Sequence, residues 1–113
     1  MDKDLHPVAQ AIHTDLIGLE ALADEIGEMQ PALDAAIDLI GSMDGRVIVT
    51  GLGQSGHIAT KLAATFASTG TPAYFLHPSE ASHGDLGMVQ PSDVILALSW
   101  SGETRELSDV IGY

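Results

Sequence analysis

Two short apolar segments, each followed by a loop of small polar residues, constrain the fold of this chain most. Val47–Val49 precedes the glycine loop Gly51–Gly56, and Val94–Leu98 precedes the serine loop Ser99–Thr104. Val94–Leu98 is apolar throughout, which is typical of a strand buried on both faces. The remaining candidates are a helix at 55–68, a strand at 73–76 and a helix after residue 104. Strands that alternate with helices predict an α/β fold with a parallel sheet in three layers.

Residues 1–44 have a different character and are predicted to form a separate helical segment before the α/β part at 45–113. They carry ten acidic residues and one lysine. Their apolar residues recur every three or four positions, which is the period of one helical face. We expect two helices here, the second beginning at Pro31, because proline suits the first turn of a helix. The acidic face is expected to be a solvated surface, with a partner-binding face as the alternative.

Composition excludes several classes of function. The chain of 113 residues has 4 basic and 16 acidic residues, a net charge of −12, and no cysteine. Nucleic acids and anionic membranes attract basic surfaces, so neither is an expected partner. A chain without cysteine has no disulfide framework and no cysteine nucleophile. Its apolar runs are far shorter than the ~20 residues that span a bilayer, so we expect a soluble cytoplasmic protein.

The glycine loop matches the G-x-G-x-x-G pattern of dinucleotide-binding folds. Such folds need an acidic residue after the second strand, about 20 residues further on, to bind the ribose. The sequence has Leu76-His77-Pro78 there, so a dinucleotide is not expected. The loop does place Ser55 at the start of a helix, where backbone N–H groups bind anions. The alternative is that Ser55 only caps the helix.

The serine loop strengthens the expectation of an anion site. Ser99, Ser101 and Thr104 place three hydroxyl groups at the end of a buried strand. Ligands of open α/β sheets bind beyond the carboxyl ends of the strands. Hydroxyl and amide groups from both loops would hold a phosphate without lysine, so we predict a phosphomonoester site. Two capped turns without a ligand are the alternative.

Histidine and glutamate side chains lie near the same strand ends. His57 follows the glycine loop, His77 ends the second strand, and His83 lies in the Ser82–Asp85 segment beyond it. They are candidates for contacts with sugar hydroxyls or a metal. Two histidines are too few to define a zinc site. Glu103 and Glu106 open the last helix, where the helix dipole favours acids, and a carboxylate beside a sugar phosphate is a candidate general base.

Four segments of the sequence resemble the arabinose 5-phosphate isomerases, which carry a sugar isomerase (SIS) domain. The segments are Gly51–His57 (GLGQSGH), Ser68–Pro72 (STGTP), His77–Gly87 (HPSEASHGDLG) and Ser99–Thr104 (SWSGET). The resemblance runs in order from about residue 45 to the end. It implies a flavodoxin-like parallel sheet and a homo-oligomer, often a tetramer.

The resemblance also implies an activity and a site. These enzymes interconvert D-ribulose 5-phosphate and D-arabinose 5-phosphate, a step that feeds lipopolysaccharide synthesis in Gram-negative bacteria. By resemblance, Ser99, Ser101 and Thr104 hold the phosphate near Ser55. The sugar site is lined by Gly70, Thr71, His77 and His83. Glu106 matches a catalytic position, His77 matches a position that can meet zinc, and no cofactor is required.

Two departures from the family weaken the expected activity. Gln54 stands where the family typically has lysine, and glutamine donates a hydrogen bond to an oxyanion without adding charge. The family also continues with further strands, further catalytic Glu and His residues and often a pair of CBS domains, so the sequence is expected to be the first part of a domain. We therefore expect weak isomerase activity, with a non-catalytic sugar-phosphate-binding module or an inactive fragment as the alternatives.

Overall fold

The computed structural model describes residues 4, 6–102 and 107–112. Its elements follow the order helix, strand, helix, strand, two short helices, strand and helix. They are α1 (Pro7–Ser42), β1 (Val47–Gly51), α2 (Gln54–Ser68), β2 (Ala73–Leu76), α3 (Pro78–Ala81), the 3₁₀ helix η1 (Asp85–Met88), β3 (Val94–Leu98) and α4 (Ser108–Gly112). All three predicted strands are confirmed, as are the predicted helix after the glycine loop and the helix near the end of the chain.

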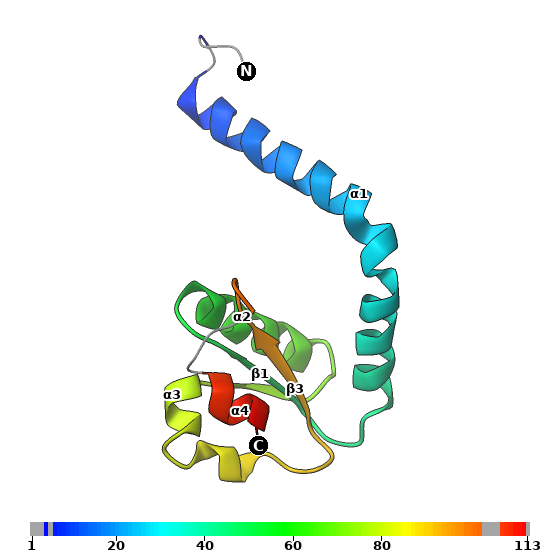
Figure 1. The fold of residues 1–113 in the computed structure, drawn as a ribbon, viewed down its shortest axis with the longest axis vertical. Coiled ribbons are helices and arrows are strands. Elements are labelled where there is room, and N and C mark those ends of the chain that lie inside the picture. Colours follow the sequence, from blue (N-terminus) through cyan, green and yellow to red (C-terminus); the bar gives the residue numbers. More distant parts are fainter. Residues whose placement is uncertain (1–3, 5, 103–106, 113) are drawn as a thin grey trace. The chain divides into compact units, whose positions relative to one another are not determined.

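The strands form one parallel sheet in the order β2-β1-β3 (Figure 1). Val47 aligns with Ala73 on one side and with Val94 on the other. Because all three strands run in the same direction, their carboxyl ends meet at one edge of the sheet. The loops that follow β1 and β3 are therefore neighbours, as the α/β prediction requires.

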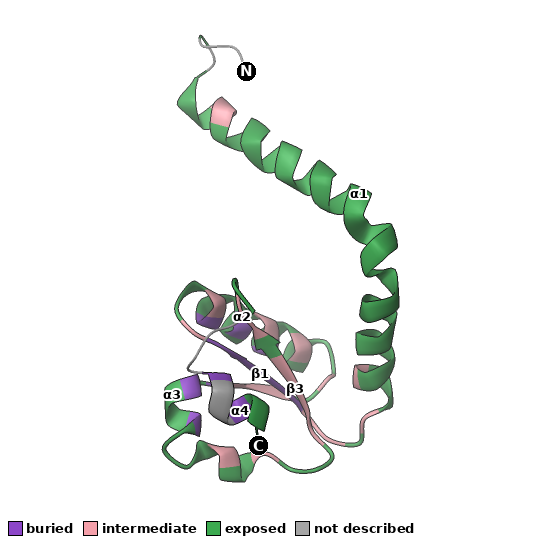
Figure 2. Ribbon diagram, in the orientation of Figure 1, coloured by how far each residue is buried: buried purple, intermediate pink, exposed green. Residues whose placement is uncertain are grey.

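The core lies on both faces of β1, which is buried along its whole length (Figure 2). On one face, Val47 and Val49 pack with Ala59 and Ala63 of α2. On the other face, Ile48 packs with three residues from the second half of the chain, which are Leu76, Ala81 and Val110. Helices therefore cover both faces of the sheet, and the predicted three layers are confirmed.

Residues 7–42 form one helix, so the prediction of two helices divided at Pro31 is wrong. Pro31 lies inside α1, where it lacks the N–H that would donate to the carbonyl of Gly27. Residues on both sides, such as Met29 and Leu33, favour the helix strongly enough to carry it through this position. Figure 1 shows that α1 bends in its cyan section, as is usual for a helix containing proline.

The chain divides into two compact units, Met1–Asp38 and Leu39–Tyr113. The second unit begins before the boundary predicted after residue 44. The reason is that Ile40 and Met43 pack against the buried cluster of the sheet, so the last turn of α1 belongs to the α/β unit. No residue of α1 is buried.

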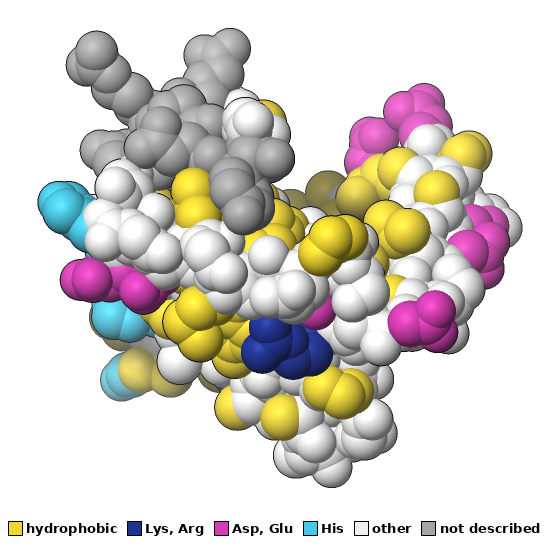
Figure 3. Space-filling view, turned by 90° about the horizontal axis from the view of Figure 1, so that it is seen from below, with side chains coloured by type: hydrophobic (Ala, Val, Ile, Leu, Met, Phe, Trp, Pro, Cys, Tyr) yellow, Lys and Arg dark blue, Asp and Glu magenta, His cyan; other side chains and the backbone are white. Residues whose placement is uncertain are grey.

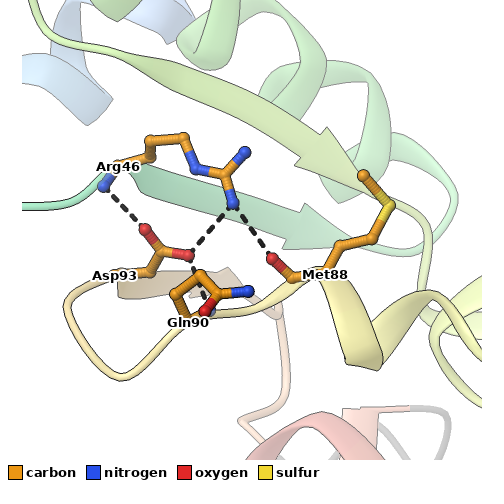
Figure 4. Close-up of polar contacts among 4 residues, drawn as sticks. All are labelled: Arg46, Met88, Gln90 and Asp93. Atoms are coloured by element: carbon orange, nitrogen blue, oxygen red, sulfur yellow. Dashed lines mark hydrogen bonds and ion pairs between the residues drawn. The ribbon is translucent and has the colours of Figure 1, made fainter.

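A polar cluster at the amino ends of the strands ties β1 to β3 (Figure 4). Asp93 accepts hydrogen bonds from the backbone N–H of Arg46 (2.8 Å) and of Gln90 (2.8 Å). The Arg46 guanidinium lies 3.3 Å from the same carboxylate and donates to the Met88 carbonyl at 3.0 Å. It also stacks over the ring of Tyr74, 4.7 Å from the centroid. The cluster lies opposite the edge where the loops after β1 and β3 meet, so it supports the fold and takes no part in a site there.

Candidate functional site

The glycine loop brings the start of α2 close to the end of β1. A Cβ at Gly56 would lie 2.8 Å from the Gly51 carbonyl oxygen, and a Cβ at Gly51 would lie 2.8 Å from the Ser55 backbone. Gly53, between them, has φ +61°, a conformation that favours glycine. The three glycines are therefore required by packing and backbone geometry, and they place the first N–H groups of α2 beside the strand end.

Ser55 does not cap α2. The N-cap is Gly53, without a side-chain capping bond, and Ser55 is the second residue of the helix. Within the part of the chain that the structure describes, the Ser55 hydroxyl has no hydrogen-bond partner. The interpretation of Ser55 as a simple cap is therefore wrong, and its hydroxyl is available to a ligand.

A cavity of about 430 Å³ lies between the start of α2 and the end of β3. The residues that line it come from the two predicted loops and their neighbours. They are Gln54, Ser55, Ile58, Ala97, Leu98, Ser99 and Trp100. We call this cavity the α2–β3 pocket. Its volume is in the range typical of small-ligand sites, and it confirms the prediction that the glycine and serine loops open onto one crevice.

The other hydroxyl residues of the serine loop have separate outcomes. Ser99 lines the pocket and accepts a hydrogen bond from the Gly102 N–H at 3.0 Å, so it also shapes its own turn. Ser101 is exposed and is not among the lining residues. Thr104 and Glu106 lie outside the described residues, so their predicted roles stay predictions.

A second cavity of about 240 Å³ lies on the other side of the glycine loop, toward β2. We call it the α2–β2 pocket. Its lining consists of loop glycines together with ring and hydroxyl side chains, namely Gly51, Gly53, Gly56, His57, Thr60, Phe75 and His77. His77 is thus brought to the strand ends as predicted. Thr60, one helical turn beyond Gly56, was not predicted, although helical spacing would have indicated it.

Gly70 and Thr71 are not brought to this edge of the sheet. They precede β2, whereas the pockets lie where β1, β2 and β3 end. The reason is the direction of α2, which carries the chain back toward the amino ends of the strands. Gly70, with φ +99°, and Thr71 end this helix by donating backbone hydrogen bonds to Ala67 and Phe66. In this chain they end α2, and their place in the sugar site stays a prediction from the resemblance.

His77 and His83 both contact the backbone of Ser79. The Ser79 N–H donates to Nδ1 of His77 at 3.1 Å, and Nδ1 of His83 lies 2.6 Å from the Ser79 carbonyl oxygen. Both histidines are exposed. Within the described residues, no three His, Cys, Asp or Glu side chains are grouped so as to hold a metal ion. Zinc needs three or four ligands, and the described residues do not supply the others at His77, so a zinc ion there stays a prediction from the resemblance.

Among the described residues, no lysine or arginine lines either pocket, so an anion there would have to be held by dipoles. Figure 3 shows how sparse basic side chains are, with a small dark-blue patch on a face that carries several acidic groups. The positive potential at the α2–β3 pocket comes from the first N–H groups of α2, a helix of 15 residues. Helix starts carry a partial positive charge and favour phosphate.

Comparisons with known proteins agree with this geometry. The family model described as "SIS domain" matches residues 42–112. The "Arabinose 5-phosphate isomerase KdsD" of Yersinia pestis is 50% identical over 102 residues, which are 90% of this chain and 30% of that protein. The protein of that name from Escherichia coli K12 is 63% identical over 67 residues, or 59% of this chain and 20% of that protein. The chain thus spans less than a third of the length of either relative.

Two solved structures share the fold. A Listeria monocytogenes protein described as a candidate sugar-phosphate isomerase has a TM-score of 0.80 at 33% identity, covering 99% of this chain and 59% of that one. An E. coli CFT073 protein solved in complex with arabinose 5-phosphate has a TM-score of 0.66 at 45% identity, covering 88% of this chain and 58% of that one. At these identities the two proteins resemble this chain in sequence as well as in fold.

Proposed function

This chain belongs to the SIS domain family, and we propose that its α2–β3 pocket binds the phosphate of a pentose phosphate. The function we infer is that of an aldose–ketose isomerase interconverting D-ribulose 5-phosphate and D-arabinose 5-phosphate. The observation that carries the proposal is that Gln54, Ser55 and Ser99, from loops far apart in the sequence, line one cavity. The names of the Y. pestis and E. coli relatives, and the arabinose 5-phosphate complex of the CFT073 protein, supply the substrate class.

The chemistry of this reaction needs few groups. Moving a carbonyl between C1 and C2 takes a proton from one carbon, passes through an enediol and returns the proton to the other carbon. A base, an acid for the oxygens and an anchor for the phosphate suffice, without an organic cofactor. Ser55 and Ser99 are the proposed anchors, together with the N–H groups of α2. Gln54 is the proposed donor to the developing oxyanion, and Glu106 is the proposed base.

A second candidate function is a sugar-phosphate-binding module without turnover. It is favoured by one observation, the uncharged Gln54 in a pocket that no lysine or arginine of the described residues lines. A neutral amide stabilises an enediolate less than an ammonium group does, because hydrogen bonds to charged groups are roughly twice as strong. Binding would then persist while the chemical step becomes slow.

We predict that arabinose 5-phosphate raises the melting temperature of the chain, whereas D-arabinose does not. Ligand at 100 times its Kd stabilises a folded protein by about 2.7 kcal/mol. The double variant Ser55→Ala/Ser99→Ala should lose this shift, and Ser68→Ala, an exposed serine near the end of α2, should keep it. An equal response to both sugars would contradict a phosphate site.

Turnover of the Gln54→Lys variant separates the two candidate functions. We expect the chain to interconvert the two pentose phosphates slowly, and the lysine to raise the rate by roughly tenfold, equivalent to about 1.4 kcal/mol of transition-state stabilisation. The measurement is a coupled or NMR-detected isomerisation assay. Binding without turnover in both proteins would identify a binding module.

We also propose that the chain self-associates through α1. An apolar stripe runs along α1, and no residue of this helix is buried. The stripe consists of Val8, Ile12, Leu16, Leu19, Leu22, Ile26, Met29, Leu33 and Ile37, each 39–66% exposed. The acidic residues lie mostly on the opposite face by helical spacing, so they do not oppose contact between two stripes. A contiguous apolar surface of this kind marks a protein interface.

Light scattering after size exclusion tests the self-association. The expected mass is a multiple of 11.8 kDa, and Leu19→Asp, at the centre of the stripe, should shift it toward the monomer. Ile17→Asp is the matched control, since Ile17 is similarly exposed but lies outside the stripe. A monomeric wild-type chain would refute the proposal.

The cellular setting stays a prediction from the resemblance. No helix among the described residues is long and apolar enough to cross a membrane. We propose a cytoplasmic role in carbohydrate metabolism, with lipopolysaccharide synthesis as the consumer of the product.

A further inference from the structure

The two histidines after β2 contact the backbone of the same residue, Ser79, one at its N–H group and the other at its carbonyl oxygen. His77 precedes α3 and receives the N–H of Ser79 on its Nδ1 atom at 3.1 Å. His83 follows α3, and its Nδ1 atom lies 2.6 Å from the carbonyl oxygen of the same residue. Neither ring has a partner for Nε2 among the described residues. Figure 3 shows histidine side chains exposed along one side of the molecule.

These partners fix which nitrogen of each ring carries the proton. A backbone N–H only donates, so Nδ1 of His77 must hold a lone pair, and the proton of the neutral ring is then on Nε2. A carbonyl oxygen only accepts, so Nδ1 of His83 must carry a proton, and the neutral ring then has its lone pair on Nε2. The backbone of one residue, Ser79, thus selects two different tautomers.

We propose that the Ser79 backbone holds His77 as an N–H donor toward a ligand in the α2–β2 pocket, and holds the neighbouring His83 in the opposite tautomer, as a hydrogen-bond acceptor. This inference rests on the proposed function. His77 lines the α2–β2 pocket, where its Nε2–H suits a carbonyl or hydroxyl oxygen of a sugar phosphate. The lone pair of His83 suits a hydroxyl hydrogen. Ser79 is the positioning residue, and it acts through its backbone alone.

The same geometry argues against a metal ion on His77. A metal binds a ring nitrogen through its lone pair, and the other nitrogen of a metal-bound histidine then donates its N–H to an acceptor. In His77 the other nitrogen accepts from a donor instead. A metal on Nε2 would require the loss of the hydrogen bond that starts α3.

His6 provides an internal comparison. It precedes Pro7 as His77 precedes Pro78, and its Nδ1 atom accepts the N–H of Val8 at 3.1 Å. The two His-Pro segments therefore begin a helix in the same way. His6 should show the tautomer of His77, although it lies in the other compact unit.

Long-range ¹H–¹⁵N correlation spectra of the full chain, recorded at alkaline pH where imidazole is neutral, test the inference. We expect the Nε2–H tautomer for His77 and His6 and the Nδ1–H tautomer for His83. Ser79→Pro removes the N–H and keeps the carbonyl, so it should release His77 into a mixture and leave His83 unchanged. Ser79→Ala keeps both backbone groups and should change neither ring. The same tautomer for His77 and His83 in the wild-type chain would overturn the inference, whether or not a variant folds.

Two titrations connect the tautomers to ligands. One equivalent of Zn²⁺ should leave the His77 ring signals unchanged, and a shift of its Nε2 signal would overturn the donor assignment.

His77→Asn keeps a capping side chain but lacks Nε2–H, so arabinose 5-phosphate should bind about threefold to tenfold more weakly, while His6→Asn binds normally. Unchanged affinity in His77→Asn refutes the ligand role of His77. Absence of binding to the wild-type chain, with the expected tautomers, refutes the proposed function instead.

Discussion

Gly56→Ala should lower the free energy of unfolding by about 1–3 kcal/mol, the usual cost of overpacking a core, and should also abolish the melting-temperature shift with arabinose 5-phosphate. The added Cβ would lie 2.8 Å from the Gly51 carbonyl oxygen and 3.4 Å from its carbon. Both atoms belong to the backbone of the central strand, so α2 must move away from β1. That movement displaces Gln54 and Ser55, which line the α2–β3 pocket.

Chemical denaturation and ligand titration of the same protein measure both effects. Gly87→Ala is the matched control, because a Cβ there meets nothing within 4 Å and the residue has no positive φ. It should change stability by less than about 0.5 kcal/mol, as surface substitutions usually do. A Gly56→Ala protein with wild-type stability and wild-type binding would contradict the close contact between α2 and β1.

Asp93→Asn should destabilise the fold by about 1–3 kcal/mol, the cost of leaving buried polar groups unsatisfied. The Asp93 side chain is only 1% exposed. Its carboxylate accepts two backbone N–H groups and the Arg46 guanidinium. An amide would turn an NH₂ group toward these donors. Asp44→Asn, at an exposed carboxylate before β1, is the matched control and should have little effect on the urea midpoint.

The Asp93 contribution should depend on pH. Burial acts to raise the pKa of Asp93, but hydrogen bonds from Gln90 and Arg46 and the charge of Arg46 outweigh it and hold the pKa below its ordinary value of 3.8. A lowered folded-state pKa stabilises the fold above the ordinary value, and this stabilisation is lost as pH falls from there through the folded-state pKa. The difference between wild type and Asp93→Asn should therefore be constant near neutral pH and shrink below about pH 4. A pH-independent difference would contradict this account.

The sheet and the meeting of the two loops were predictable because they follow from local sequence and a general rule. The apolar run Val94–Leu98 and the β-branched run Val47–Val49 define buried strands, and carboxyl ends of parallel strands share an edge. Ser55 and Ser99 were placed in one crevice on this ground alone. Family resemblance was not needed for that step.

Other features depend on tertiary geometry that sequence patterns do not contain. Pro31 was expected to begin a helix, yet the strong helix formers around it extend α1 through the proline. Gly70 and Thr71 resemble site residues, but the direction of α2 places them before β2. The tautomers of His77 and His83 depend on the hydrogen bonds of the Ser79 backbone, which only coordinates reveal.

The central claim is that the glycine and serine loops hold one phosphoryl group between them. Amide chemical-shift mapping during a titration with arabinose 5-phosphate tests it most directly. We predict that the amides of Gln54, Ser55, Ser99 and Trp100 shift together with a single affinity, and that D-arabinose leaves them unchanged. Shifts confined to one loop, or binding that leaves both loops unperturbed, would contradict the account.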